Sequence, residues 1–156
     1  AFGLKYGSIQ VLMSGAETVG LALTIAGLAL FALLAWRRLG GRLESARPGD
    51  VALTVMLVSV TTSRVYSPQF NVWLIGLASV ALLDRACRVR LPITIVIGVS
   101  ILTQIVYPWS ATQLVTGDPV TISVQGVRVV ALLVALVLGL RAILRDHPEP
   151  APTMVG

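Results

Sequence analysis

A short polar stretch interrupts two apolar runs near the middle of the chain, in "TTSRVYSPQFNVWLIG". Arg64, Tyr66, Ser67 and Gln69 gather there. The guanidinium of arginine is a planar fork of donors that matches the oxygens of a phosphate group. The grouping of Arg64 with three polar neighbours therefore predicts a site that binds a phosphate, with Tyr66, Ser67 and Gln69 shaping its wall.

A second arginine, Arg128, lies about one turn into the last long apolar segment. An arginine in the middle of a membrane segment costs about 2.5 to 3.5 kcal/mol on insertion scales, which makes it a candidate functional residue. Together, Arg64 and Arg128 could hold a lipid-linked phosphate. Two structural alternatives stay open: Arg128 extends its charged end to the lipid headgroups, and Arg64 caps helix carbonyls or pairs with an acidic residue.

Other site chemistry finds little support in the sequence. A single cysteine, Cys87, and a single histidine, His147, exclude an internal disulfide and a zinc cluster. The sequence shows no paired carboxylates, nucleophile triad or phosphate-cradling glycine loop. Asp84 is expected to be a loop or cap residue. We therefore predict no metal and no cofactor, and the catalytic residues are unknown.

The composition is that of a membrane protein. The chain has 156 residues, of which 56% are hydrophobic and 12% are charged, and its mean hydropathy is +0.88. Soluble domains carry about 25% charged residues. The net charge of +5 would suit a nucleic-acid partner in a soluble protein, but here the arginines lie in short gaps between apolar segments, so no nucleic-acid partner is expected.

The apolar segments predict an all-α integral membrane fold with about five transmembrane helices. Residues 1–145 form a single transmembrane helical region, which begins with an external loop segment over 1–17, and residues 146–156 form a disordered cytoplasmic tail. The stretch from Pro108 to Ser123 is expected to be an external loop. The five spans are expected at about 18–36, 51–66, 70–83, 91–107 and 124–144.

Small residues in the first two spans are expected to let helix backbones approach closely. They are Gly20, Ala22, Ala26, Gly27, Ser59 and Ser63.

Basic residues favour the cytoplasmic side of a membrane. Three basic residues fall on one side of the predicted membrane, namely Lys5, Arg64 and Arg128, and nine fall on the other. This imbalance predicts an external N-terminus and a cytoplasmic C-terminus. An odd number of spans with an external start also predicts upstream transmembrane helices in a longer protein. The other side receives nine arginines, namely Arg37, Arg38, Arg42, Arg47, Arg85, Arg88, Arg90, Arg141 and Arg145.

The turn between the second and third spans has short apolar runs on both sides. Either neighbouring helices cover these runs, or the turn lies below the outer membrane surface, where a non-helical backbone is tolerated if it lines a cavity. Arg64 and Tyr66 would then face that cavity.

The segments "SRVYSPQFNVWLIGL" and "LTQIVYP" resemble the C-terminal membrane region of actinobacterial polyprenyl-phosphate-sugar-dependent glycosyltransferases of the GT-C type, notably glycosyltransferase family 87. That family often shows a segment like "VFSPQYLLWLLP", which aligns with Val65 to Gln69. Phe70 stands where the family usually has tyrosine.

The resemblance implies a multi-pass enzyme of the bacterial plasma membrane that moves a sugar, typically mannose, from a polyprenyl phosphate donor to a lipid or glycan acceptor on the outer face. Its catalytic carboxylate would lie in an external loop upstream. Membrane lipids, the sugar donor and the upstream helices are the implied partners. The alternative is a non-enzymatic membrane protein that binds a lipid phosphate or acts as an assembly subunit. A transporter is disfavoured because the SPQ turn lies near the outer end rather than the midplane.

Overall fold

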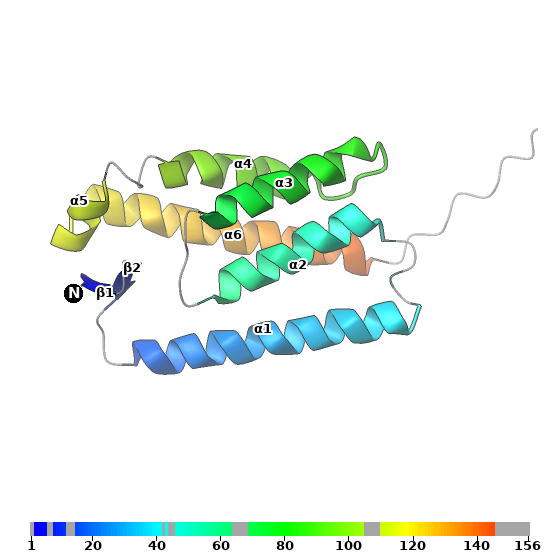
Figure 1. The fold of residues 1–156 in the computed structure, drawn as a ribbon, viewed down its shortest axis with the longest axis horizontal. Coiled ribbons are helices and arrows are strands. Elements are labelled where there is room, and N and C mark those ends of the chain that lie inside the picture. Colours follow the sequence, from blue (N-terminus) through cyan, green and yellow to red (C-terminus); the bar gives the residue numbers. More distant parts are fainter. Residues whose placement is uncertain are drawn as a thin grey trace, which may run out of the picture.

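The computed structural model describes residues 2–5, 8–11, 15–41, 43, 46–63, 69–104 and 110–145. In these residues the chain is mainly helical, with a short antiparallel hairpin at its N-terminal end (Figure 1). The hairpin pairs β1 (Phe2–Lys5) with β2 (Ser8–Val11). The helices are α1 (Ala16–Leu39), α2 (Pro48–Thr62), α3 (Gln69–Leu83), α4 (Arg90–Gln104), α5 (Ala111–Thr116) and α6 (Pro119–Leu144).

Proline and aspartate set the starts of several helices. Pro48 and Pro119 occupy the first positions of α2 and α6, where the missing N–H has no helical partner to lose. Pro92 lies in the first turn of α4, where a missing N–H is tolerated in the same way. Asp118 caps α6 by accepting the Thr121 backbone N–H at 2.8 Å.

The long helices run along a common axis in alternating directions (Figure 1). Helix α2 packs against α1, α3 and α6, and α4 packs against α6 and α3. The short helix α5 lies against β1 and α6. Leucine and valine side chains from α2, α3 and α4 fill the core, among them Leu53, Leu57, Leu74 and Val96.

The structure puts a long helix in each of the five expected ranges, with different ends. The predicted loop from Pro108 to Ser123 is wrong, because α5 and the first turn of α6 lie within it. Helix α2 begins at Pro48 and ends at Thr62, whereas the expected span was 51–66. The Asp118–Pro119 pair is an N-cap followed by proline, which is a helix start signal, and it moves the start of α6 ahead of the expected Val124.

One expected packing glycine makes a very close helix contact. A Cβ atom on Gly27 of α1 would clash with the hydroxyl of Thr62 in α2. The packing role of Gly27 is therefore confirmed. The expected packing role is wrong for four others, whose side chains are exposed, namely Ala22, Ala26, Ser59 and Ser63.

Two helices, α1 and α6, are long and apolar enough to cross a membrane. Their 24 and 26 residues correspond to about 36 and 39 Å of helix, against about 30 Å of bilayer hydrocarbon. Helices α2, α3 and α4 are apolar but have 15 residues each, or about 22 Å. Five crossings therefore remain a prediction.

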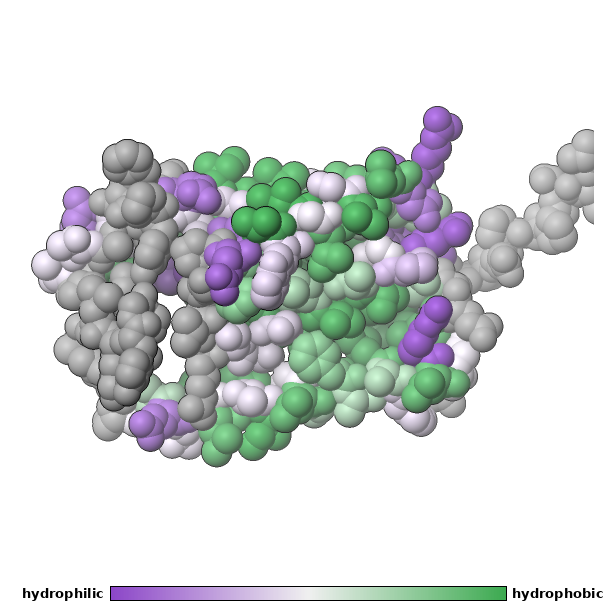
Figure 2. Space-filling model, in the orientation of Figure 1, coloured by the Kyte–Doolittle hydropathy of each residue, from purple (hydrophilic) through white to green (hydrophobic). Residues whose placement is uncertain are grey.

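Apolar side chains cover much of the outside of the bundle. Leu28, Trp36, Val72, Val130 and Val134 are among the exposed ones. Figure 2 shows hydrophobic residues across the middle of the visible face and hydrophilic residues toward its two ends. Large exposed apolar surfaces of this kind mark contact with a membrane or a partner protein.

The basic side chains separate along the axis of the bundle. The end that holds the α3–α4 loop and the C-terminus of α6, hereafter the basic end, carries eight of the described arginines. The opposite end, hereafter the hairpin end, holds β1, β2, α5 and the N-terminus of α6 (Figure 1). The arginines of the basic end are Arg37, Arg38, Arg47, Arg85, Arg88, Arg90, Arg141 and Arg145.

Candidate functional site

The structure places two of the five expected site residues. Arg64, Tyr66 and Ser67 lie outside the described residues. Gln69 is the first residue of α3, and its side chain is exposed. Arg128 lies in α6 and is only 4% exposed. Gln69 begins α3 and Arg128 lies in the first half of α6. The starts of both helices point toward the hairpin end (Figure 1).

Arg128 is held between two helices. Its Nη1 atom donates to the hydroxyl oxygen of Thr103 in α4 at 3.5 Å. The Thr103 hydroxyl in turn donates to the Val99 carbonyl at 2.7 Å. Because Arg128 is buried, the alternative in which its guanidinium extends outward to the headgroups is wrong. It also lies about 13 Å along α6, deeper than the single turn expected, because the helix begins at Pro119.

Further polar side chains are buried in the same half of the bundle. Asn71 lies in the first turn of α3 and Ser100 near the end of α4, and both are buried. Ser100 donates to the Val96 carbonyl at 2.9 Å. Neither residue was predicted from the sequence. A polar side chain within an otherwise apolar run, as in "QFNVWL", was the signal that could have identified Asn71.

An apolar groove adjoins this region, between the end of α4 and the start of α6. Its volume is about 420 Å³. Val127, which precedes Arg128 in α6, contributes to its wall. The groove is lined by Leu102, Pro119, Val120, Ser123, Val124 and Val127.

The acidic residues near the hairpin end differ in their surroundings. Asp118 accepts hydrogen bonds from the Thr121 backbone N–H and from the Thr121 hydroxyl, both at 2.8 Å. These bonds favour the carboxylate and lower the pKa of Asp118, with the backbone N–H as the larger cause. Asp118 is therefore engaged as a helix cap. Glu17 lies in the first turn of α1 and is exposed.

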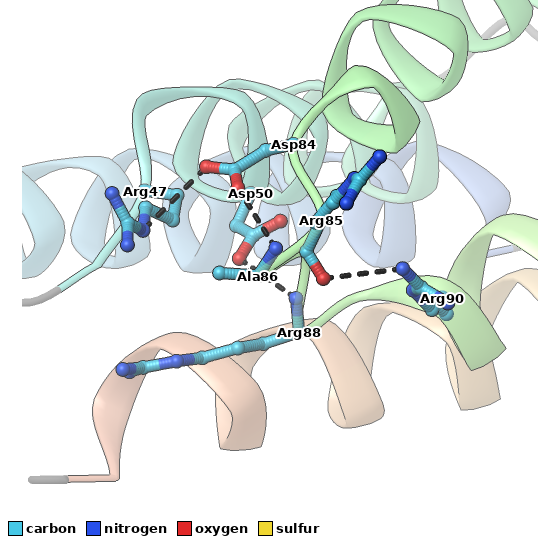
Figure 3. Close-up of polar contacts among 7 residues, drawn as sticks. All are labelled: Arg47, Asp50, Asp84, Arg85, Ala86, Arg88 and Arg90. Atoms are coloured by element: carbon cyan, nitrogen blue, oxygen red, sulfur yellow. Dashed lines mark hydrogen bonds and ion pairs between the residues drawn. The ribbon is translucent and has the colours of Figure 1, made fainter. Parts of the chain in front are cut away.

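A second polar cluster lies at the basic end, around the α3–α4 loop (Figure 3). Asp84 Oδ1 accepts the Ala86 backbone N–H at 2.8 Å, and its Oδ2 lies 3.5 Å from Arg47 Nε. Asp84 thus organises the loop, as expected. Asp50, which is 1% exposed, accepts the Arg88 backbone N–H on Oδ2 at 3.1 Å. Asp50 was missed, because nothing in its local sequence indicates a partner 38 positions away.

Cys87 is buried beside Asp50. Burial raises the pKa of its thiol, the Val89 backbone N–H lowers it, and the neighbouring Asp50 carboxylate raises it further. A buried thiol with a raised pKa is a poor nucleophile at neutral pH. Within the described residues, no group of three or more His, Cys, Asp and Glu side chains could hold a metal ion.

The chain was compared with protein families, curated proteins and solved structures. No family model, no curated protein and no solved structure matches it.

Proposed function

We propose that this chain is a multi-pass protein of the bacterial plasma membrane, with its five long helices crossing the bilayer and the basic end in the cytoplasm. Three observations support this. Helices α1 and α6 are long and apolar enough to span, apolar side chains cover the exterior, and arginines concentrate at one end. The shorter α2, α3 and α4 would be accommodated by local thinning of the bilayer, at a fraction of a kcal/mol per Å.

Within this bundle, Arg128 is proposed to bind the phosphate of a polyprenyl phosphate sugar donor together with Arg64. The observation that carries this proposal is a guanidinium that is only 4% exposed inside an apolar bundle and that donates to the Thr103 hydroxyl at 3.5 Å. A phosphate oxygen would form charge-assisted hydrogen bonds of about 2.7 to 2.9 Å, roughly twice as strong as neutral ones. A phosphate could therefore replace the Thr103 contact.

The apolar groove between the end of α4 and the start of α6 suits the apolar part of the same ligand. Its wall is formed mainly by aliphatic side chains of α4 and α6, with Val127 next to Arg128 in sequence. Each buried CH₂ group contributes about 0.8 kcal/mol of transfer free energy. A donor with its phosphate at Arg128 and the start of its lipid chain in the groove would use both features.

The proposed reaction is sugar transfer, in which this chain acts on the leaving group. A carboxylate from another part of the enzyme would take the proton of the acceptor hydroxyl, and the acceptor oxygen would bond to the anomeric carbon. The bond from that carbon to the phosphate oxygen would break and release polyprenyl phosphate. Arg64 and Arg128 would stabilise the negative charge that develops on this phosphate. Tyr66, Ser67 and Gln69 would shape the wall of the pocket.

The test uses the full-length protein in membranes, with a polyprenyl phosphate mannose donor. We expect Arg64→Ala and Arg128→Gln each to lower sugar transfer by about 100-fold or more, the usual effect of removing a group that stabilises the developing charge. Arg141→Gln, which removes an exposed arginine at the basic end, is the matched control. Normal transfer in both variants, with normal insertion, would remove the phosphate-binding role.

A second candidate is a non-enzymatic membrane protein that binds a lipid phosphate or acts as an assembly subunit. The engagement of Asp118 as a helix cap favours it, since that carboxylate is already satisfied by Thr121. The two functions separate in the same assay. Binding of the donor that depends on Arg128, without transfer to any lipid or glycan acceptor, would favour the binding protein.

A further inference from the structure

The guanidinium of Arg90 is held against the backbone of Arg85 in the loop between α3 and α4. Arg85 lies in this loop and Arg90 begins α4, and both are exposed. Arg90 Nη2 donates to the Arg85 backbone carbonyl at 3.2 Å. Figure 3 shows the Arg90 side chain reaching the Arg85 backbone carbonyl, on the side of the loop away from Arg47. The hydrogen bond fixes one guanidinium next to the residue that carries the other.

The nearby carboxylates are already engaged elsewhere. Asp84 uses one oxygen for the Ala86 backbone N–H and the other for Arg47. Asp50 is buried and faces the Arg88 backbone N–H. In the part of the chain that the structure describes, neither Arg85 nor Arg90 forms an ion pair. The charges of Arg85 and Arg90 therefore have no carboxylate partner among the described residues.

Exposed leucines flank the two arginines. Leu83 at the end of α3 is 84% exposed, and Leu91 at the start of α4 is 59% exposed. Positive charge without a carboxylate partner, beside exposed aliphatic side chains, fits a ligand with an anionic head and an apolar tail. Free phosphate would use only the arginines and would leave the leucines uncovered.

We propose that Arg85 and Arg90 bind the headgroup phosphate of an anionic phospholipid of the cytoplasmic leaflet, with its acyl chains against Leu83 and Leu91. The proposal rests on the membrane placement under the proposed function, but it concerns the opposite end of the bundle from Arg128. Guanidinium groups bind phosphate oxygens through paired hydrogen bonds. Basic clusters next to the cytoplasmic ends of membrane helices attract anionic lipids.

The experiment compares two double variants of the full-length protein. Arg85→Gln/Arg90→Gln removes the proposed site. Arg141→Gln/Arg145→Gln removes the same charge from two exposed arginines of the same end. Each protein is placed in nanodiscs of phosphatidylcholine alone or doped with phosphatidylglycerol, and the phosphatidylglycerol retained after extraction is measured by native mass spectrometry.

We expect the 85/90 variant to retain phosphatidylglycerol about tenfold more weakly than the wild type, and the 141/145 variant to change about twofold or less. Equal losses in both variants would mean general attraction to the basic end and would overturn the site. Protection of the thermal midpoint by glycerol phosphate as strong as by the lipid would assign the arginines to a free phosphate and would overturn the lipid.

The measurement uses no sugar donor, so it fails or succeeds independently of sugar transfer. Retention of phosphatidylglycerol without sugar transfer would contradict the proposed glycosyltransferase and leave the proposed lipid site intact. Extraction of the protein from membranes by alkaline carbonate would remove the shared premise and overturn both proposals.

Discussion

Asp50 carries a carboxylate into the packed interior at the basic end, where it is 1% exposed. It lies in the first turn of α2, where the positive end of the helix dipole favours an anion. Its Oδ2 accepts the Arg88 backbone N–H, so a single side chain ties the start of α2 to the α3–α4 loop. The same carboxylate contributes to the raised pKa of the Cys87 thiol.

Removal of this carboxylate is expected to loosen the loop. Loss of a buried hydrogen bond to a charged group costs about 1.5 to 3 kcal/mol, so Asp50→Ala should lower the free energy of unfolding by that amount. Cys87 should then react with a maleimide several-fold faster, because its burial, the largest cause of its raised pKa, is reduced. Thermal unfolding and the rate of alkylation measure the two effects.

Asp50→Asn separates the two causes, since the amide oxygen can still accept the Arg88 N–H but the negative charge is gone. We expect Cys87 to be alkylated more slowly in the Asp50→Asn variant than in the Asp50→Ala variant. Equal rates in both variants would mean that charge, rather than the tie to the loop, protects the thiol. Glu17→Ala, which removes an exposed carboxylate at the hairpin end, should leave both measurements unchanged.

At the scale of the helices, three glycines set how closely α2 meets its neighbours. Gly27 of α1 faces Thr62, and a Cβ on Gly139 of α6 would lie 3.0 Å from the Thr54 hydroxyl oxygen. Both threonine hydroxyls are already donated to the backbone of α2, which limits how far they can move. A third such contact joins Gly49, in the first turn of α2, to Ala81 of α3.

Gly27→Ala is expected to separate α1 from α2, because the new methyl group would overlap Thr62. Overpacking of this kind costs about 1 to 3 kcal/mol. Gly98→Ala is the matched control, since nothing lies within 4 Å of a Cβ at that exposed position in α4, and the change should be neutral or stabilising by up to about 1 kcal/mol. Thermal unfolding in detergent compares the two. A Gly27→Ala protein as stable as the control would show that α1 does not pack this tightly.

The sequence predicts the helices better than their contacts. Long apolar runs broken by arginine, glycine and proline are enough to locate five helical segments, and α3 differs from its expected start by one residue. The sequence does not show that Gly27 faces α2 whereas Ala26 faces outward, because both the inside and the outside of this bundle are apolar. The polar-to-apolar contrast that orients a helix in a soluble protein is then weak.

The same holds for the expected site: a residue type could be read from the sequence, but its contacts could not. Arg128 stands out in an apolar run, so its type was enough to select it. Its partner Thr103 is 25 positions away and could not be read from local sequence. The proline that follows Asp118 is a signal for a helix cap. The cap was not predicted, because the segment was expected to be a loop.

At the scale of the whole molecule, the bundle is polar at both ends and apolar between them. Eight described arginines lie at the basic end, while Arg128 is buried toward the hairpin end. Cytoplasmic loops are enriched in arginine and lysine, so this distribution predicts the orientation. The five long helices alternate in direction, so each of them must cross the bilayer if the five-span arrangement is right. Helix α4 is a critical case, since it has only 15 residues.

Cysteine labelling on both sides of α4 tests this directly. In a Cys87→Ser background, Ala86→Cys and Thr116→Cys each place one thiol at an exposed position, the first before α4 and the second after it. In intact cells, a membrane-impermeant maleimide should label Thr116→Cys fully and Ala86→Cys only after permeabilisation, because the basic end faces the cytoplasm. The reverse pattern would invert the orientation and place Arg128 toward the cytoplasmic half. Equal labelling of both thiols in intact cells would mean that α4 does not cross, and the five-span arrangement would then be wrong even if α1 and α6 still spanned the bilayer.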